Sequence, residues 1–173
     1  GVLASDFCTE IGLDVVPLSS GVLEELTALL PDWWVPGNPV DLVAGLDFNI
    51  LKPTIEILMK SGEVDAVVFL WIGAPRREGE KGSYKTVQGT DASAIWGIMD
   101  NMLVKTYVEL HQLMQEMQVP LYMASGLHLA DDGEDPNVSS NRPLIFSNVE
   151  SACRALSAMA EYQAYLTAIE LSS

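Results

Sequence analysis

The sequence predicts an α/β fold with a parallel β-sheet. Short apolar runs alternate along the chain with longer segments in which apolar residues recur at helical spacing. The strongest run, VDAVVFLWI at 64–72, is nearly all apolar, as is typical of a strand covered by helices on both faces. Of the 173 residues, 49% are apolar and 19% are charged, a composition that forms a core.

The first elements can be placed from their boundary residues. Residues 2–11 are expected to form a helix that stops at Gly12, because glycine commonly terminates helices. The β-rich run LDVVPL predicts a strand over 13–18. Ser19 and the serine after it are N-cap candidates for a helix over 21–30.

The middle of the chain follows the same alternation. A helix is expected over 46–59, with Asp47 as a possible cap, and Pro53 either kinks it or marks its true first turn. Strand 64–72 comes next. A polar, glycine-rich loop follows, and residues 91–117 then predict a long amphipathic helix.

The last third of the chain contains two more strand candidates. VPLYMA predicts a buried strand over 119–124, and a short strand over 144–146 follows a polar loop. Asn148 is placed to cap a final helix from residue 149 to about residue 171.

Two motifs near the start resemble those of one family. The first motif is matched by Gly1, Val2, Leu3, Ala4 and Asp6, and the second by Asn38, Pro39, Val40, Asp41 and Leu42. They resemble the C-terminal flavodoxin-like CoA-ligase domain of NDP-forming acyl-CoA synthetases, relatives of succinyl-CoA synthetase. The closing segment PLIFSNVESACRALSAMAEYQAYL is similar to that family's last strand and helix.

The resemblance implies a flavodoxin-like three-layer sandwich with strand order 2-1-3-4-5. The family's first strand, which is central in that order, is missing ahead of Gly1. A sheet without its middle strand has a row of unpaired backbone groups. We therefore expect residues 1–173 to be a single CoA-ligase-like domain, a fragment of a larger multidomain chain or one whose gap a neighbour fills.

Gly1, Val2 and Leu3 are candidates for binding phosphate through their backbone amides. The first N–H groups of a helix have no partners within it, and the helix dipole adds partial positive charge there. In the family, such a helix start faces the phosphorylated histidine intermediate. The alternative is an ordinary helix start at the surface.

Asn38, Pro39 and Asp41 are candidates for bracing this site. Pro39 restricts Asn38 to extended geometry, and the Asn38 and Asp41 side chains suit turn and cap hydrogen bonds. A purely structural role for this loop is the alternative. Trp33 and Trp34 precede it, and they either stack on a nucleotide or partner domain or cover an edge of the core.

A basic cluster follows strand 64–72, at the strand's carboxyl end. Its members are Arg76, Arg77, Lys81 and Lys85. Because nucleotide and CoA phosphates are anionic, these residues are candidates for a mobile lid over an anion. Two glutamates interleave with them, so a solvated loop is the alternative.

No catalytic residue and no metal ligand is assigned to this chain. The family's phosphorylated histidine lies in a Ser-His-Thr-Gly-like motif of a different domain, and that motif is absent here. His111 falls within a helix and His128 in a loop beside two aspartates, and neither has a nucleophile near it in the sequence that would give it a catalytic role. The chain also lacks a P-loop and a Rossmann glycine motif.

The resemblance implies part of an acid–thiol ligase that interconverts acyl-CoA and nucleoside triphosphate. Its partners would be CoA-binding and ATP-grasp domains or subunits of the same enzyme, and assembly into a homo-oligomer is a further alternative. CoA, ATP/ADP or GTP/GDP, and Mg belong to the parent enzyme, with none held by this domain alone. The alternative is a non-catalytic flavodoxin-like module for interaction or small-anion binding.

The charge balance narrows the choice of partners. With 24 acidic and 9 basic residues the formal net charge is −15, which disfavours binding to nucleic acid or an anionic membrane surface. The first residues lack the pattern of a signal peptide, and no apolar run would span a bilayer. Cys8 and Cys153 are expected to be free core thiols, so a cytoplasmic location is predicted.

Overall fold

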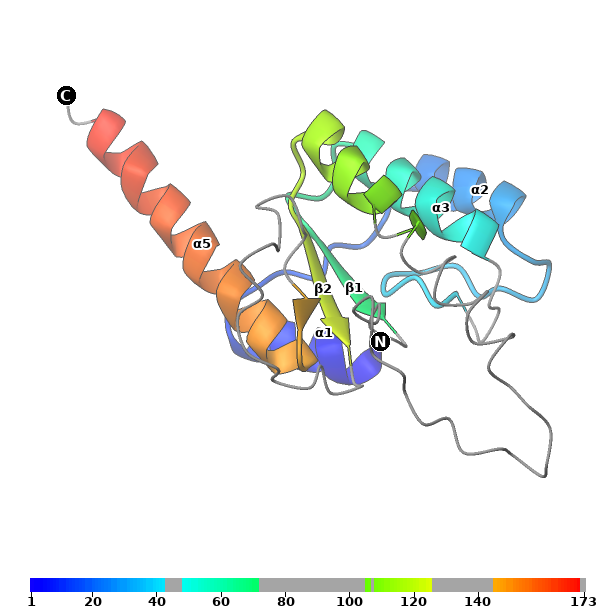
Figure 1. Cartoon of the computed structure of the whole chain (residues 1–173), viewed down its shortest axis with the longest axis horizontal. Helices are drawn as coiled ribbons and strands as arrows, with labels where there is room; N and C mark the ends of the chain where they lie inside the picture. Colours follow the sequence, from blue (N-terminus) through cyan, green and yellow to red (C-terminus); the bar gives the residue numbers. More distant parts are fainter. Residues whose placement is uncertain (43–47, 72–104, 107, 126–144, 172–173) are drawn as a thin grey trace, which may run out of the picture.

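The protein is an α/β structure in which helices cover both faces of a small parallel sheet (Figure 1). The computed structural model describes residues 1–42, 48–71, 105–106, 108–125 and 145–171. Within these ranges the helices are α1 (Val2–Glu10), α2 (Ser20–Leu29), α3 (Phe48–Lys60) and α5 (Val149–Glu170). Residues 105–106 and 108–117 are also helical.

The sheet is open and all its described strands run parallel. Strands β1 (Val67–Trp71), β2 (Leu121–Ser125) and β3 (Ile145–Phe146) lie in the order β1-β2-β3. In the register, Val67 is opposite Leu121 and Met123 is opposite Ile145. Strands in this arrangement end at the same edge of the sheet, so the expected parallel α/β architecture is confirmed.

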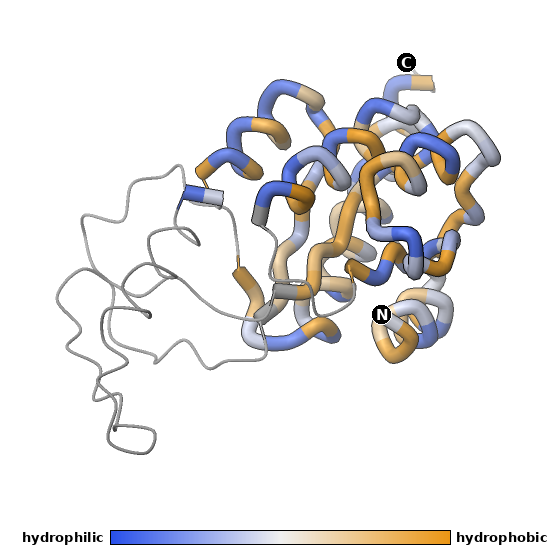
Figure 2. The backbone as a smooth tube through the Cα atoms, turned by 90° about the vertical axis from the view of Figure 1, so that its right-hand side faces the viewer, coloured by the Kyte–Doolittle hydropathy of each residue, from blue (hydrophilic) through white to orange (hydrophobic). Residues whose placement is uncertain are grey.

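The main core lies between β2 and the helices on one face of the sheet. Leu121 and Met123 of β2 pack there with Leu51 and Ile55 of α3 and with Leu110 of the helical segment 108–117. Helix α2 continues this layer by packing on α3. Because alternate side chains of a strand point to opposite faces of the sheet, Leu121 and Met123 share this face. In Figure 2, hydrophobic and hydrophilic residues alternate along the helices that pack around the sheet.

The opposite face of the sheet is covered by α5, and α1 packs in turn on α5. Ala152 and Cys153, near the start of α5, are fully buried. The second half of α5 extends away from the sheet, and the chain's C-terminus lies at its tip (Figure 1). Tyr122 of β2 and Phe146 of β3 stack with their ring centroids 6.1 Å apart.

Boundary residues act largely as the sequence predicts. The Ser19 side chain accepts a hydrogen bond from the Val22 N–H at 3.4 Å, and Asn148 caps α5 through the Ser151 N–H at 2.8 Å. Gly12 has a φ of +84°, so it ends α1 in the left-handed conformation that glycine adopts without strain.

One prediction about the elements is wrong, and for Pro53 one of the two alternatives is excluded. Residues 13–18 are not a strand, because they are extended without joining the ladder of the described sheet. Leu18 instead packs in a second apolar cluster, called the α2 cluster, whose buried members are Leu18, Val22, Leu26, Leu30 and Trp34. The Asn38 side chain donates a hydrogen bond to the Val16 carbonyl. Pro53 lies inside α3 and does not mark its first turn. The caps and loops expected at Asp47, 73–90 and 126–142 fall outside the described residues.

None of the helices in the described ranges has the length and apolar character needed to cross a bilayer.

Candidate functional site

The start of α1 has an open N-terminal turn. Gly1 is its N-cap, no described side chain caps it, and its first turn contains no acidic residue. Val2 and Leu3 are 72% and 80% exposed, so apolar packing does not cover the turn. The helix end therefore presents backbone N–H groups and the positive end of the dipole to its surroundings.

The second motif lies directly beside this helix start. A Cβ atom placed on Gly1 would lie 3.0 Å from Cγ and 3.4 Å from Cβ of Pro39. A larger residue at position 1 would thus displace the proline ring, and glycine permits the close approach. The structure brings together the two sequence motifs, which are separated by more than thirty positions.

The loop carrying the second motif is anchored from both sides. Val40 and Leu42 pack, partly buried, against the α2 cluster. Asn38, Pro39 and Asp41 alternate with them and are exposed. The Asn38 Nδ2 group donates a hydrogen bond of 2.9 Å to the Val16 carbonyl, so the loop is tied to the segment that joins α1 to α2. The loop thus has a fixed position next to Gly1.

The two tryptophans before this loop separate into different environments. Trp34 is 6% exposed and belongs to the α2 cluster. It therefore covers an edge of the core, which is one of the two alternatives predicted for the tryptophans. Its indole N–H is buried without a hydrogen-bond partner in the described part of the chain. Trp33 is 58% exposed and is accessible to a ligand or partner.

The remaining candidates from the sequence are the basic cluster and the two histidines. Arg76, Arg77, Lys81 and Lys85 lie outside the described residues, and so does His128. His111 is in the helical segment 108–117, where its Nε2 lies 3.1 Å from the Gln115 side-chain nitrogen. Its Nδ1 is buried and has no partner within the described ranges.

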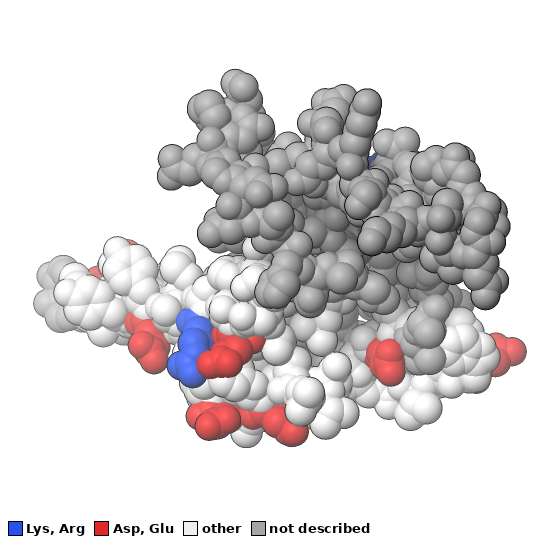
Figure 3. Space-filling model, turned by 60° about the horizontal axis from the view of Figure 1, so that its bottom comes forward, with Lys and Arg blue, Asp and Glu red and all other residues white. Residues whose placement is uncertain are grey.

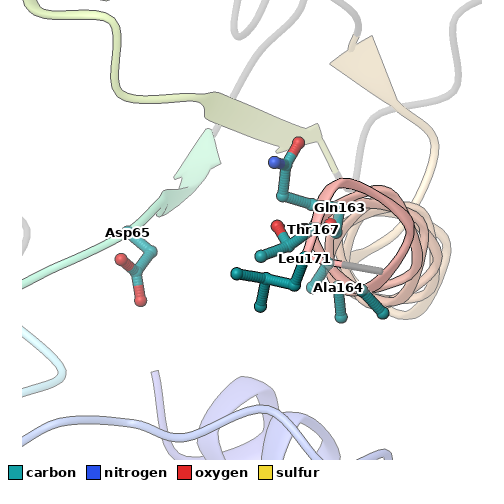
Figure 4. Close-up of a pocket in the computed structure, with 7 residues that line it drawn as sticks. Asp65, Gln163, Ala164, Thr167 and Leu171 are labelled. Carbon is teal, nitrogen blue, oxygen red and sulfur yellow. Dashed lines mark hydrogen bonds between the residues drawn. The ribbon is translucent and has the colours of Figure 1, made fainter. Parts of the chain in front are cut away.

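A hollow that the sequence analysis did not single out lies between the lead-in to β1 and the second half of α5. Its volume is about 600 Å³. Asp65 stands across the hollow from Gln163 and Thr167 (Figure 4). The α5 side is lined in part by three alanines, Ala160, Ala164 and Ala168. Their four-residue spacing places them on one face of the helix, which could have been read from the sequence.

Acidic side chains dominate the charged groups on the face shown in Figure 3. Arg154 is paired with Glu150 at 2.9 Å. Lys60 is paired with Glu56, and Lys105 lies 3.7 Å from Glu109. No group of three or more potential metal ligands occurs among the described residues. These three cationic side chains are thus already engaged by neighbouring carboxylates.

The chain matches none of the family models and none of the curated proteins with which it was compared. The resemblance to acyl-CoA synthetases therefore rests on the sequence alone, on the two motifs and the closing segment.

Proposed function

We propose that this chain is a domain of an NDP-forming acyl-CoA synthetase, in which it helps to stabilise the phosphohistidine intermediate. The observation that carries the proposal is the contact between Gly1 and Pro39. It unites the two motifs of the resemblance at one helix N-terminus. Both motifs occur at the separation expected for the family, and the α/β architecture is compatible with its flavodoxin-like sandwich.

In this proposal the chain supplies positioning and electrostatic stabilisation, and the histidine comes from a companion domain. The N–H groups of Val2 and Leu3 donate hydrogen bonds to oxygens of the phosphoryl group. Fixed donors aimed at developing charge contribute about 3 kcal/mol each in comparable sites. Pro39 and its loop hold the start of α1 in place. CoA, the nucleotide and Mg bind to the CoA-binding and ATP-grasp partners.

The helix layers on the two faces of the sheet also support the flavodoxin-like part of the proposal. Helices α1 and α2 lie on opposite sides of the sheet, and they pack chiefly on α5 and α3. The extended segment 13–18 passes between them without a ladder partner in the described sheet.

The test removes one N–H donor while keeping the helix. Val2 is the first residue of α1, a position where proline is tolerated because its N–H is not used within the helix. Val2→Pro should weaken binding of inorganic phosphate or of a phosphohistidine peptide about tenfold, the expected loss of one charge-assisted hydrogen bond. Isothermal titration measures this change.

Val2→Ala is the matched control, because it shortens the side chain and keeps the N–H. It should bind as the unmodified chain does. Equal affinities for Val2→Pro and Val2→Ala, or no saturable binding by the unmodified chain, would overturn the proposal. The chain alone should also make no acyl-CoA from acid, CoA and ATP.

The second candidate is a non-catalytic interaction module, and the outer half of α5 favours it. Met159, Tyr162, Tyr165 and Ile169 are between 45% and 61% exposed there, which is unusual for large apolar side chains on one helix. Tyr162→Lys together with Tyr165→Lys should abolish association with a partner under this function. Phosphate binding at α1 should be unaffected by that change.

A further inference from the structure

The two cysteines are far apart in sequence and adjacent in space. The Sγ atoms of Cys8 in α1 and Cys153 in α5 lie 3.4 Å apart, and both are free thiols. Since the sulfur atoms of a disulfide are about 2.04 Å apart, the two atoms need to approach by roughly 1.4 Å to become bonded. The facing pair thus requires a small local adjustment.

We propose that Cys8 and Cys153 are a modification site at which a small peroxide forms a reversible disulfide that fastens α1 to α5. The inference is independent of the proposed function, since it depends only on the two sulfur atoms and on the packing around them.

Helix α1 is suited to such a fastening because few contacts hold it. Cys8 is its only buried residue, and among the described elements it packs chiefly on α5. Arg154 lies over the Phe7 ring at 5.3 Å from its centroid. The Ser157 hydroxyl donates a hydrogen bond of 3.4 Å to the Ile11 carbonyl. A covalent bond in the middle of these contacts would remove the freedom of α1 to separate.

The exposures of the two thiols set the order of the steps. Cys8 is 8% exposed and Cys153 is fully buried, so a brief separation of α1 from α5 admits peroxide to Cys8 first. The Cys8 thiolate attacks one peroxide oxygen, the O–O bond breaks, hydroxide leaves, and Cys8 becomes a sulfenic acid. Because Cys8 is largely buried, a small neutral peroxide reaches its thiol more easily than a bulky disulfide oxidant does.

The second step joins the two helices. The Cys153 sulfur attacks the Cys8 sulfenic sulfur, the S–O bond breaks, and water leaves with the Cys153 proton. The proton that Cys8 loses on becoming a thiolate combines with the leaving hydroxide, so two thiols and one molecule of hydrogen peroxide give one disulfide and two molecules of water. A thiol reductant reverses the reaction.

The experiment exposes the folded protein to hydrogen peroxide, blocks the remaining thiols with N-ethylmaleimide after unfolding, and identifies peptides by mass spectrometry. We expect an intramolecular Cys8–Cys153 peptide that a reductant removes. Met159 is 55% exposed, so its oxidation to the sulfoxide is an internal control for sufficient peroxide. Oxidised Met159 with two alkylated cysteines, or disulfides only between chains, would overturn the proposal.

Single variants test the order of the steps. In Cys153→Ser, Cys8 should stop at the sulfenic acid and be labelled by dimedone. In Cys8→Ser, Cys153 should resist labelling because it is fully buried. Labelling of Cys153 at the rate of Cys8 would contradict the assigned order.

Thermal unfolding tests whether the bond fastens the helix. A disulfide that closes so long a loop restricts the unfolded chain, so the oxidised protein should melt about 5 °C or more above the reduced protein. Peroxide-treated Cys8→Ser is the control, because it carries the same methionine oxidation without the bond. An unchanged or lowered melting temperature would show that the disulfide strains α1, and the fastening would be rejected.

Discussion

Cys153 is held in its neutral thiol form by its surroundings. Burial is the main cause, and the hydrogen bond and charge of Cys8 add to it, which together raise the pKa of the Cys153 thiol from 9.0 to about 12. The folded state therefore binds this proton more tightly than the unfolded state does. The resulting stability is fully present below pH 9.0 and is lost as the pH rises toward 12.

Alkaline unfolding checks this effect. The stability of the reduced protein should fall more steeply between pH 9 and 12 than that of Cys153→Ala, measured by urea unfolding at each pH. The variant is less stable at every pH because it loses packing, but it no longer has the pH-dependent contribution of the Cys153 thiol. Parallel pH profiles would mean that the thiol is not shielded from solvent.

Glu63 provides the opposite sign of pH dependence. Hydrogen bonds from the Ser19 hydroxyl and from the Ser19 N–H, the latter at 2.9 Å, lower the pKa of the Glu63 carboxyl below 4.5. Its contribution to stability is present above pH 4.5 and is lost as the pH falls through the lowered pKa.

Glu63→Gln should therefore lower the melting temperature at neutral pH, and the difference should shrink as the pH falls below 4.5. Calorimetry at several pH values measures it. Glu25→Gln is the matched control, because it removes an exposed charge from α2. A pH-independent difference would assign the effect of Glu63→Gln to something other than this carboxylate.

The pairing of α2 with α3 depends on a small set of apolar side chains. Leu26 is fully buried in the α2 cluster. Leu26→Ala should lower the free energy of unfolding by about 3 kcal/mol, because it leaves a cavity that the helices cannot close fully. Leu3→Ala makes the same change at a residue that is 80% exposed, and it should cost less than about 0.5 kcal/mol. Denaturant unfolding compares them, and equal losses would contradict the burial of Leu26.

Helices were the most predictable elements of this chain. Ser19 and Asn148 mark their starts by side-chain chemistry that acts within three residues, so neighbouring sequence suffices. Residues 13–18 show the limit of this reasoning. Their composition favours a strand, but a strand also requires a hydrogen-bonded neighbour, and local sequence does not specify where that neighbour lies.

The candidate site was predictable only in parts. The open helix start at Gly1 and the extended loop at Pro39 follow from local chemistry, whereas the contact between them depends on the path of the intervening chain. The same applies to the adjacency of Cys8 and Cys153. Distant pairs of this kind are set by how helices pack, which spacing along one segment does not encode.

The whole molecule carries a large negative charge that its ion pairs do little to balance. The formal net charge is −15, and the three ion pairs among the described residues each join side chains four positions apart in the sequence. Such local pairs contribute little to stability. Repulsion among the excess acidic side chains should therefore outweigh the attraction within these ion pairs.

Raising the ionic strength from roughly 0.01 M to roughly 0.15 M should thus raise the melting temperature, because a shorter Debye length screens the repulsion. Scanning calorimetry in sodium chloride measures this, with the same series near pH 4.2, where the net charge is close to zero, as the control. A melting temperature that falls with salt would indicate that attractive ion pairs dominate.

The long reach of α5 has a mechanical consequence. Its 22 residues extend about 33 Å, yet its fully buried side chains, Ala152 and Cys153, are close to its first turn. The helix is consequently a lever rooted at one end. A force applied near Ile169 would act as a torque on the first turns of α5 and would be transmitted to β2 and α1, which pack on α5.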